Sequence, residues 1–277
     1  MNSPILDIVP RRLFITPYYD DPERSELERM QLTLDSWACY DAAVAGNYDR
    51  TLEIILSWMS CLECVNDEAK LVMLIKGQLF LEAFLLLPKA LQEDTTTAFE
   101  FWLKHVYHKC VSRFWKASNN RGAWAILGFA LECKVFDLRL SNYRWNMFIS
   151  QATNSNGKLW IEAKRTNSGM WYSYYTLAPL LRASQLLTVN KYMLRPALDW
   201  LFFYVKNPDL WPFKPQRGPI GWLQRWWHPC ADFREDPQPR GWPHNLYHVA
   251  GKMFKRDDWL QWGGEPPYEG VNIFRHG

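Results

Sequence analysis

Hydrophobic positions recur at steps of three and four residues along most of this chain, a spacing typical of amphipathic α-helices. The first such run extends from Ser25 to about Gly46, and its apolar positions are Leu27, Met30, Leu34, Trp37 and Ala38. Runs with the same spacing predict further helices from Tyr48, over residues 68–87, from Asp94 to Cys110, after an interruption at Asn119-Asn120 through Trp124 to Leu131, and over residues 138–152, 169–188, 191–205 and 245–255. The sequence therefore predicts an all-α protein whose helices are joined by short links.

The segments around these runs have a different character. Residues 1–24 are rich in Pro, Asp and Tyr and predict an irregular arm, and residues 158–161 have a strand-like pattern after a turn with Asn and Gly. Residues 207–277 contain many Pro and Trp, with one short helix expected at 221–227. No linker and no fixed-length repeat is visible, so we expect one domain over residues 1–277, either a helical bundle or an α/α toroid.

Aromatic residues are frequent, with 16 Trp, 13 Tyr and 15 Phe in 277 residues. Many would fill the core, and the remainder would offer flat surfaces on which sugar rings pack. The net charge of +3 and the lack of a basic run argue against a nucleic-acid partner. The most apolar stretch, residues 79–87, includes Glu82 and ends before Pro88, so we expect no membrane-spanning helix and no membrane partner.

The motifs indicate neither a cofactor nor a metal. No phosphate loop, dinucleotide fingerprint or nucleophile elbow is present. Cys61 and Cys64 have the spacing of a metal or redox pair, but they lie in a helical pattern without a second Cys or His pair at zinc-site spacing. We therefore expect no cofactor, and we interpret the six cysteines as free, buried thiols.

Two short segments concentrate polar side chains in otherwise apolar and aromatic surroundings. The first is Asn119-Asn120-Arg121-Gly122-Ala123-Trp124, and the second is Glu162-Ala163-Lys164-Arg165 followed by Tyr172. Together they supply amides, cations and a phenol, and a buried core could hold such cations only if each were paired or solvated. An anion-binding site that also transfers a proton has a use for this set.

These segments resemble the alginate lyases of polysaccharide lyase family five and related uronan lyases with α/α toroid folds. That family has Asn-Asn-His followed by a Trp, then Glu-Leu-Lys-Arg, and then a Tyr seven residues after that Arg; the second segment aligns without a gap from Glu162 to Leu180. The resemblance implies an incomplete α/α toroid of antiparallel helix hairpins that cleaves an acidic polysaccharide by β-elimination. It implies catalytic roles for Asn120, Arg165 and Tyr172, and substrate contacts for Asn119, Arg121, Trp124, Glu162, Lys164, Trp171 and Tyr175.

The chemistry of β-elimination suits these residue types. The reaction removes the C5 proton of a 4-linked uronate, next to its carboxylate, and protonates the departing O4. Asn120 and Arg165 have donors that match the carboxylate as it gains negative charge. Nearby cations lower the pKa of a phenol from its ordinary value of about 10. The resemblance implies that Tyr172 acts as both base and acid.

Arg121 departs from the family pattern, which has His at this position. A guanidinium does not accept a proton at working pH, so Arg121 can bind charge but cannot assist the base. In D-mannuronate and D-glucuronate the C5 proton and O4 lie on the same face of the ring, so one phenol serves both. L-Guluronate and D-galacturonate place them on opposite faces and need a separate base. We therefore predict syn elimination at D-mannuronate or D-glucuronate.

Two other functions remain open from the sequence. An α/α glycoside hydrolase would need two carboxylates in its cleft, with Glu162 and either Asp35 or Asp41 as candidates. A non-catalytic uronan-binding protein would keep the fold, with Arg121 marking a disabled site. The oligomeric state is also open. Because no signal-peptide pattern is visible, the sequence fits a cytoplasmic protein, a phage-borne protein, or an exported protein whose leader is missing from this chain.

Overall fold

The computed structural model describes residues 11–138, 142–164, 169–212 and 243–264. The chain divides into two compact units. The first combines residues 1–115 with 128–139, and the second combines residues 116–127 with 140–277. One domain over the whole chain stays a prediction.

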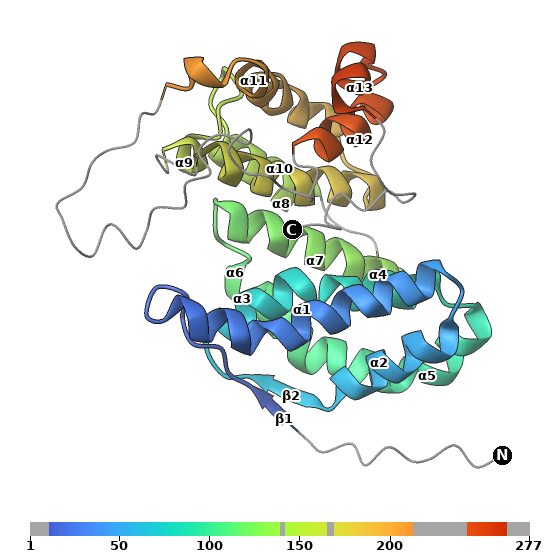
Figure 1. Cartoon of the computed structure of the whole chain (residues 1–277). Helices are drawn as coiled ribbons and strands as arrows, with labels where there is room; N and C mark the ends of the chain where they lie inside the picture. The colour runs from blue at the N-terminus through green and yellow to red at the C-terminus, as the bar shows by residue number, and fades with distance from the viewer. Residues whose placement is uncertain (1–10, 139–141, 165–168, 213–242, 265–277) are drawn as a thin grey trace. The chain divides into compact units, whose positions relative to one another are not determined.

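The first unit is built mainly from helices (Figure 1). Its helical elements are α1 (Pro22–Val44), α2 (Tyr48–Met59), α3 (Asp67–Lys76), α4 (Gln78–Leu86), α5 (Lys89–Trp102), the π-helical turn η1 (Leu103–Tyr107), α6 (His108–Phe114) and the later part of α7 (Asn120–Val135). Stacked aromatic rings join α4 to α5, with the centroids of Phe84 and Phe99 4.1 Å apart. The helical character predicted for this part of the chain is confirmed.

Helix α1 buries a different face from the one that its hydrophobic pattern predicts. Its buried residues are Ser25, Leu32, Ser36, Cys39 and Ala43. Leu27, Met30 and Leu34 are instead exposed, and Leu27 keeps 67% of its surface accessible. Small side chains on the buried face let α1 approach α2 and α4 closely. The close packing gained in this way outweighs the burial of the larger apolar residues. The apolar face predicted for this helix is therefore wrong.

Two segments, one predicted to be irregular and the other helical, form paired strands instead. Strand β1 (Arg11–Leu13) lies parallel to β2 (Cys61–Cys64). Arg12 and Glu63, 51 residues apart in the sequence, form an ion pair across the strands. Local periodicity does not encode such a pairing, so the helical assignment of Cys61 and Cys64 is wrong. Both cysteines are nevertheless buried and free, as expected.

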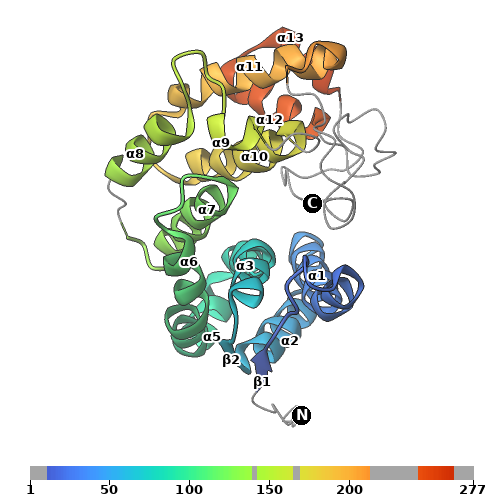
Figure 2. The same cartoon turned by 90° about the vertical axis from the view of Figure 1, so that its left-hand side faces the viewer.

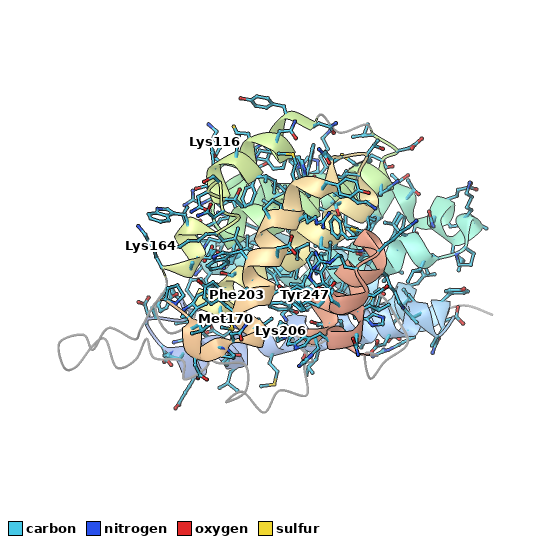
Figure 3. All side chains as sticks on the ribbon, turned by 90° about the horizontal axis from the view of Figure 1, so that it is seen from above. Lys116, Lys164, Met170, Phe203, Lys206 and Tyr247 are labelled. Atoms are coloured by element: carbon cyan, nitrogen blue, oxygen red, sulfur yellow. The ribbon has the colours of Figure 1, made fainter. Side chains whose placement is uncertain are left out.

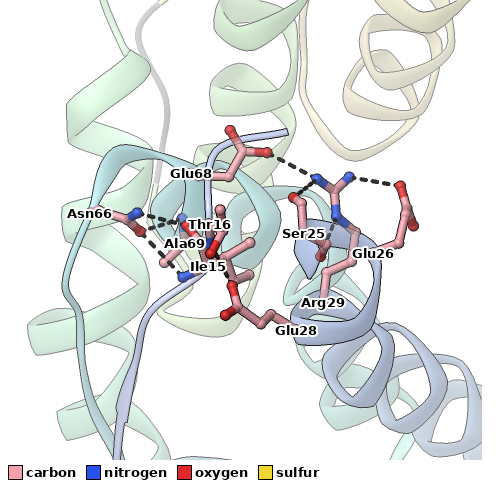
Figure 4. A network of polar contacts seen from close by, with 9 residues as sticks. All are labelled: Ile15, Thr16, Ser25, Glu26, Glu28, Arg29, Asn66, Glu68 and Ala69. Carbon is pink, nitrogen blue, oxygen red and sulfur yellow. Dashed lines mark hydrogen bonds and ion pairs between the residues drawn. The ribbon is translucent and has the colours of Figure 1, made fainter. Parts of the chain in front are cut away.

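Polar contacts tie the segment after β1 to the helices of its unit (Figure 4). Asn66, which caps α3, donates from Nδ2 to the carbonyl of Ile15 at 2.7 Å. The backbone N–H of Thr16 donates to Glu28 Oε2 on α1 at 2.5 Å. The arm predicted over residues 1–24 is therefore wrong from Arg11 onward, because that part contains a strand, anchored residues and the start of α1.

Two helix boundaries also differ from the prediction. The helix expected over residues 68–87 is divided at Gly77 into α3 and α4. Helix α5 begins directly after Pro88 and not at Asp94. The hydroxyl of Thr95 donates to the carbonyl of Leu91 at 2.7 Å. This residue therefore bonds back to the preceding turn inside the helix and does not cap a helix start.

The second unit holds the start of α7 and a further set of helices (Figure 2). They are α8 (Asn142–Ala152), α9 (Trp160–Ala163), α10 (Gly169–Leu186), α11 (Arg195–Lys206), α12 (His244–Phe254) and α13 (Asp257–Gly263), with 3-10 turns η3 (Lys191–Leu194) and η4 (Pro208–Leu210). Helix α10 packs against α9, α11 and α12, which places it at the centre of this unit.

The strand predicted over residues 158–161 is wrong. Leu159 makes a single antiparallel bridge to Thr153, and α9 follows at once. Helix α13 was not predicted, and the helix expected at 221–227 lies outside the described residues. Within the described ranges, no helix is both long enough and apolar enough to cross a membrane.

Candidate active site

The first motif segment forms the start of α7. The carbonyl of Asn119 accepts from the backbone N–H groups of Gly122 at 2.9 Å and Ala123 at 3.2 Å, and its Oδ1 accepts from Arg121 N at 3.1 Å. Asn119 therefore caps the helix. Asn120 Oδ1 also accepts from Arg121 N, at 2.8 Å. Because both side-chain oxygens face the helix, the Nδ2 group is the part of each amide that can donate outward.

The turn into α7 requires a glycine at position 122. A Cβ at Gly122 would lie 1.9 Å from the carbonyl oxygen of Ala117 and 2.9 Å from the ring of Phe148. Arg144 on α8 donates from Nη2 to the same Ala117 carbonyl at 2.9 Å, and its burial lowers the pKa of the guanidinium. Sequence reasoning missed Arg144, because one arginine in a helical run gives no signal. It supports the turn that presents Asn119.

Glu162 joins the second motif segment to the first. It lies in α9 with 2% of its surface exposed, and its Oε1 accepts from the backbone N–H of Asn120 at 2.6 Å. The N–H groups in the first turn of a helix have no partner in their own helix, and the helix dipole favours negative charge there. The Glu162 carboxylate meets both requirements, so α9 holds the start of α7 in place.

Helix α10 begins beside α9 as well. A Cβ at Gly169 would lie 2.6 Å from the carbonyl oxygen of Ala163, so the two helices meet where no side chain would fit. Tyr172 lies in the first turn of α10 and is half-buried. Asn120 and Tyr172 therefore lie in the first turns of two helices that both start next to α9.

Aromatic contacts join α7 and α10 one turn further along. The ring centroid of Trp124 lies 5.0 Å from that of Tyr175, which stacks on Trp171 at 5.5 Å. Trp124 is buried between the helices, whereas Trp171 and Tyr175 are partly exposed. Trp124 follows Asn120 by four residues, and Tyr175 follows Tyr172 by three. The Trp124–Tyr175 contact therefore joins the second turn of α7 to the early part of α10, one turn beyond Asn120 and Tyr172.

A second tyrosine on α10 has a different environment. Tyr174 is buried, and its hydroxyl accepts from Asn245 Nδ2 of α12 at 3.3 Å. Burial raises the pKa of Tyr174 above its usual range, and the bond from Asn245 only partly opposes this. A phenol that ionises with such difficulty is unsuited to proton abstraction. Among these two tyrosines, Tyr172 has the more accessible side chain.

The remaining predicted residues lie nearer the surface or outside the described ranges. Arg121 and Lys164 are exposed, and Lys164 Nζ lies 3.8 Å from the ring centroid of Trp160. Arg165 lies outside the described residues. Asp35, a candidate carboxylate for a hydrolase, accepts from Trp58 Nε1 at 2.9 Å in the first unit.

Within the described residues, no three or more His, Cys, Asp or Glu side chains are grouped so that they could hold a metal ion.

Comparison with known proteins gives one family and one fold. A family model described as alginate lyase matches residues 34–211, more than half of the chain, and this range includes both motif segments. Among solved structures, a His-to-Ala variant of alginate lyase A1-III complexed with tetrasaccharide matches with a TM-score of 0.62 and 16% sequence identity, over 90% of this chain and 77% of that chain. This likeness shows the fold, which is of the α/α toroid type. A comparison with curated proteins finds no match. The chain belongs to the alginate lyase family, and the enzyme is a polysaccharide lyase that acts on uronate polysaccharide.

Proposed function

We propose that this enzyme cleaves a polysaccharide at 4-linked D-mannuronate or D-glucuronate by syn β-elimination. The observation that carries the proposal is the placement of Asn120 and Tyr172 in the first turns of α7 and α10, both next to α9. An amide donor and a phenol at the starts of two helices that flank the same short helix support joint action on one sugar ring.

Asn120 and Arg165 bind the carboxylate of the reacting uronate. Asn120 Oδ1 is engaged by Arg121 N, so its Nδ2 group donates to the substrate. Arg165 follows directly after the C-cap of α9, Lys164, and its planar guanidinium matches a carboxylate in two parallel bonds. As the C5 proton leaves, negative charge accumulates on the carboxylate. Donors that are already in position stabilise this charge most in the transition state.

Tyr172 moves the proton. Its phenolate takes the C5 proton, the C5–H electrons form the C4–C5 double bond, and the C4–O4 bond breaks. The same phenol then returns the proton to O4 of the leaving sugar, which completes the reaction without a second acid. The position of Tyr172 in the first turn of a helix of 18 residues supports this role, because the positive end of the helix dipole favours an anion there.

Arg121 limits the reaction to one kind of epimer. It is exposed at the start of α7, where its charge attracts and orients an acidic chain. It supplies no base for the opposite face of the ring. A uronate whose C5 proton and O4 lie on opposite faces would therefore bind without being cleaved.

A panel of uronans tests the proposal. Polymannuronate and a polymer of β-1,4-linked D-glucuronate should give an unsaturated product that absorbs in the ultraviolet, whereas polyguluronate and polygalacturonate should not. New reducing ends without ultraviolet absorbance would point to hydrolysis, and binding without either signal would point to a non-catalytic protein. Either result would overturn the proposed reaction.

A further inference from the structure

The outer side of α9 carries a small cationic and aromatic surface, formed by Lys158, Trp160 and Lys164 and called here the Trp160 patch. Trp160 has 48% of its surface exposed, and Lys164, labelled in Figure 3, is also exposed. Residues four apart lie on the same side of a helix, while a residue two positions away points to the opposite side. The patch therefore faces away from Glu162, whose carboxylate binds the start of α7.

Both lysines of the patch contact the same indole. Lys164 Nζ lies 3.8 Å and Lys158 Nζ 4.6 Å from the ring centroid of Trp160. Their separation cannot exceed the sum of these two distances, so two positive charges are held near each other. The pKa of the Lys158 ammonium is lowered, mainly by burial and to a smaller extent by repulsion from the charge of Lys164. Two cations this close together favour an anionic ligand beside them.

The chemistry of the patch indicates which anion. The cation–π contacts hold two flexible lysine side chains in place, which reduces the entropy that a ligand would have to overcome. An exposed indole offers apolar surface to the C–H groups of a sugar ring, and paired ammonium groups attract carboxylates. A chain of uronate units presents both features in every residue. Within this enzyme, such a chain is also the polymer that has to reach the residues beside α9.

We propose that the Trp160 patch binds a uronate unit of the polysaccharide other than the unit at the cleaved bond. This inference rests on the proposed function, because it uses the same substrate class. It adds Lys158 and Trp160, which lie outside both sequence motifs, and assigns Lys164 to this outer position. The patch contributes affinity for long chains and takes no part in the proton transfer.

Binding and turnover measured separately test this proposal. Retention in gels containing polymannuronate reports binding, and ultraviolet absorbance reports turnover. Lys158→Gln and Trp160→Ala are each expected to raise the dissociation constant for the polymer about fivefold to tenfold and to raise its KM to a similar degree. Lys158→Gln should also weaken the salt dependence of binding, because it removes a positive charge. Lys206→Gln is the matched control, because its ammonium also lies over an aromatic ring, 5.5 Å from the centroid of Phe202, but on α11 and not in the patch. This control should behave like the wild type.

Each outcome decides the question. If both patch variants bind and turn over polymannuronate as the wild type does, the outer binding position is wrong while the proposed reaction stands. If the wild type is retained but gives no unsaturated product, and the variants lose retention, the patch stands and the reaction is wrong. If the wild type is retained in neither polymannuronate nor β-1,4-linked polyglucuronate gels and forms no unsaturated product from either polymer, both are wrong. Should Trp160→Ala lower the melting temperature, Lys158→Gln alone decides, since it keeps most of the side chain.

Discussion

Glu162 Oε1 accepts a hydrogen bond from the backbone N–H of Asn120 at 2.6 Å, and this contact joins segments 42 residues apart in the sequence. The carboxylate is buried, so the bond is not shared with solvent. Resemblance alone places Glu162 among the substrate contacts. The geometry favours a different role, in which Glu162 positions Asn120, the residue proposed to bind the substrate carboxylate.

Replacing Glu162 by Ala should weaken both stability and catalysis. The buried N–H of Asn120 would lose its partner, which costs about 1–3 kcal/mol of unfolding free energy. The displaced amide of Asn120 should lower kcat/KM about tenfold to a hundredfold, and Glu162→Gln should restore part of both because its amide oxygen can still accept. Chemical denaturation and steady-state kinetics measure the two effects. Glu53→Ala, which removes an exposed ion pair with Arg50, is the control and should change neither.

If Glu162→Ala retained full stability but lost substrate binding, a direct contact with the substrate would be the better account. A similar loss in Glu162→Gln and Glu162→Ala would also argue against positioning, because only the alanine variant removes the acceptor.

Two tyrosines two residues apart on α10 provide a matched test of the proton carrier. Tyr172→Phe should lower kcat by about a hundredfold to ten-thousandfold while polymer binding stays within about twofold of the wild type, because only the transferred proton is lost. Tyr174→Phe should instead cost about 1 kcal/mol of stability through the bond from Asn245, with kcat nearly unchanged. Ultraviolet product assays and retention on polymannuronate gels measure both. Equal activity in Tyr172→Phe and wild type would rule out the proposed mechanism.

A buried acid in the first unit predicts how stability depends on pH. Glu132 is 3% exposed, and its burial raises the pKa of the carboxyl to about 7, although His108 Nδ1 at 2.9 Å opposes the shift. The pKa of an unfolded glutamate is about 4.3. Because the folded pKa is the higher one, this contribution to stability is complete below about pH 4 and is lost as the pH rises through about 7.

Glu132→Gln should remove this dependence. Urea unfolding at pH 4, 6 and 8 should show the wild type losing on the order of 3–4 kcal/mol relative to the variant across this range. Glu93→Gln, at an exposed position of α5, is the control and should follow the wild type at every pH. A difference between wild type and Glu132→Gln that stays constant with pH would mean that this carboxyl does not titrate in the range.

The sequence predicted the parts of the molecule that depend on neighbouring residues and missed those that depend on distant ones. Helices α7 and α10 follow from apolar spacing. The strand at Cys61–Cys64 and the exposed face of α1 depend on partners elsewhere in the chain, which local periodicity does not contain.

The same distinction applies to the candidate site. The motifs named Asn120, Glu162 and Tyr172, but their order along the chain could not show that α9 lies between the starts of two helices. Arg144 and Asn245 were missed because each acts on a residue far from it in the sequence. Buried polar contacts of this kind become visible only when the packing of the helices is known.

Arg121→His tests the link between this position and the epimer that is cleaved. Arg121 is exposed at the start of α7, so the substitution should fold normally and change stability by less than about 0.5 kcal/mol. A neutral imidazole can accept a proton where a guanidinium cannot, so it can act on the face of the ring that Tyr172 does not serve. Arg121→His should therefore gain measurable turnover of polyguluronate and retain turnover of polymannuronate. Arg121→Gln is the control, because it removes the charge without adding a base. It should weaken polymer binding and gain no new substrate. The ratio of initial rates on the two polymers measures the effect, and an unchanged ratio in Arg121→His would show that residue 121 does not determine the epimer.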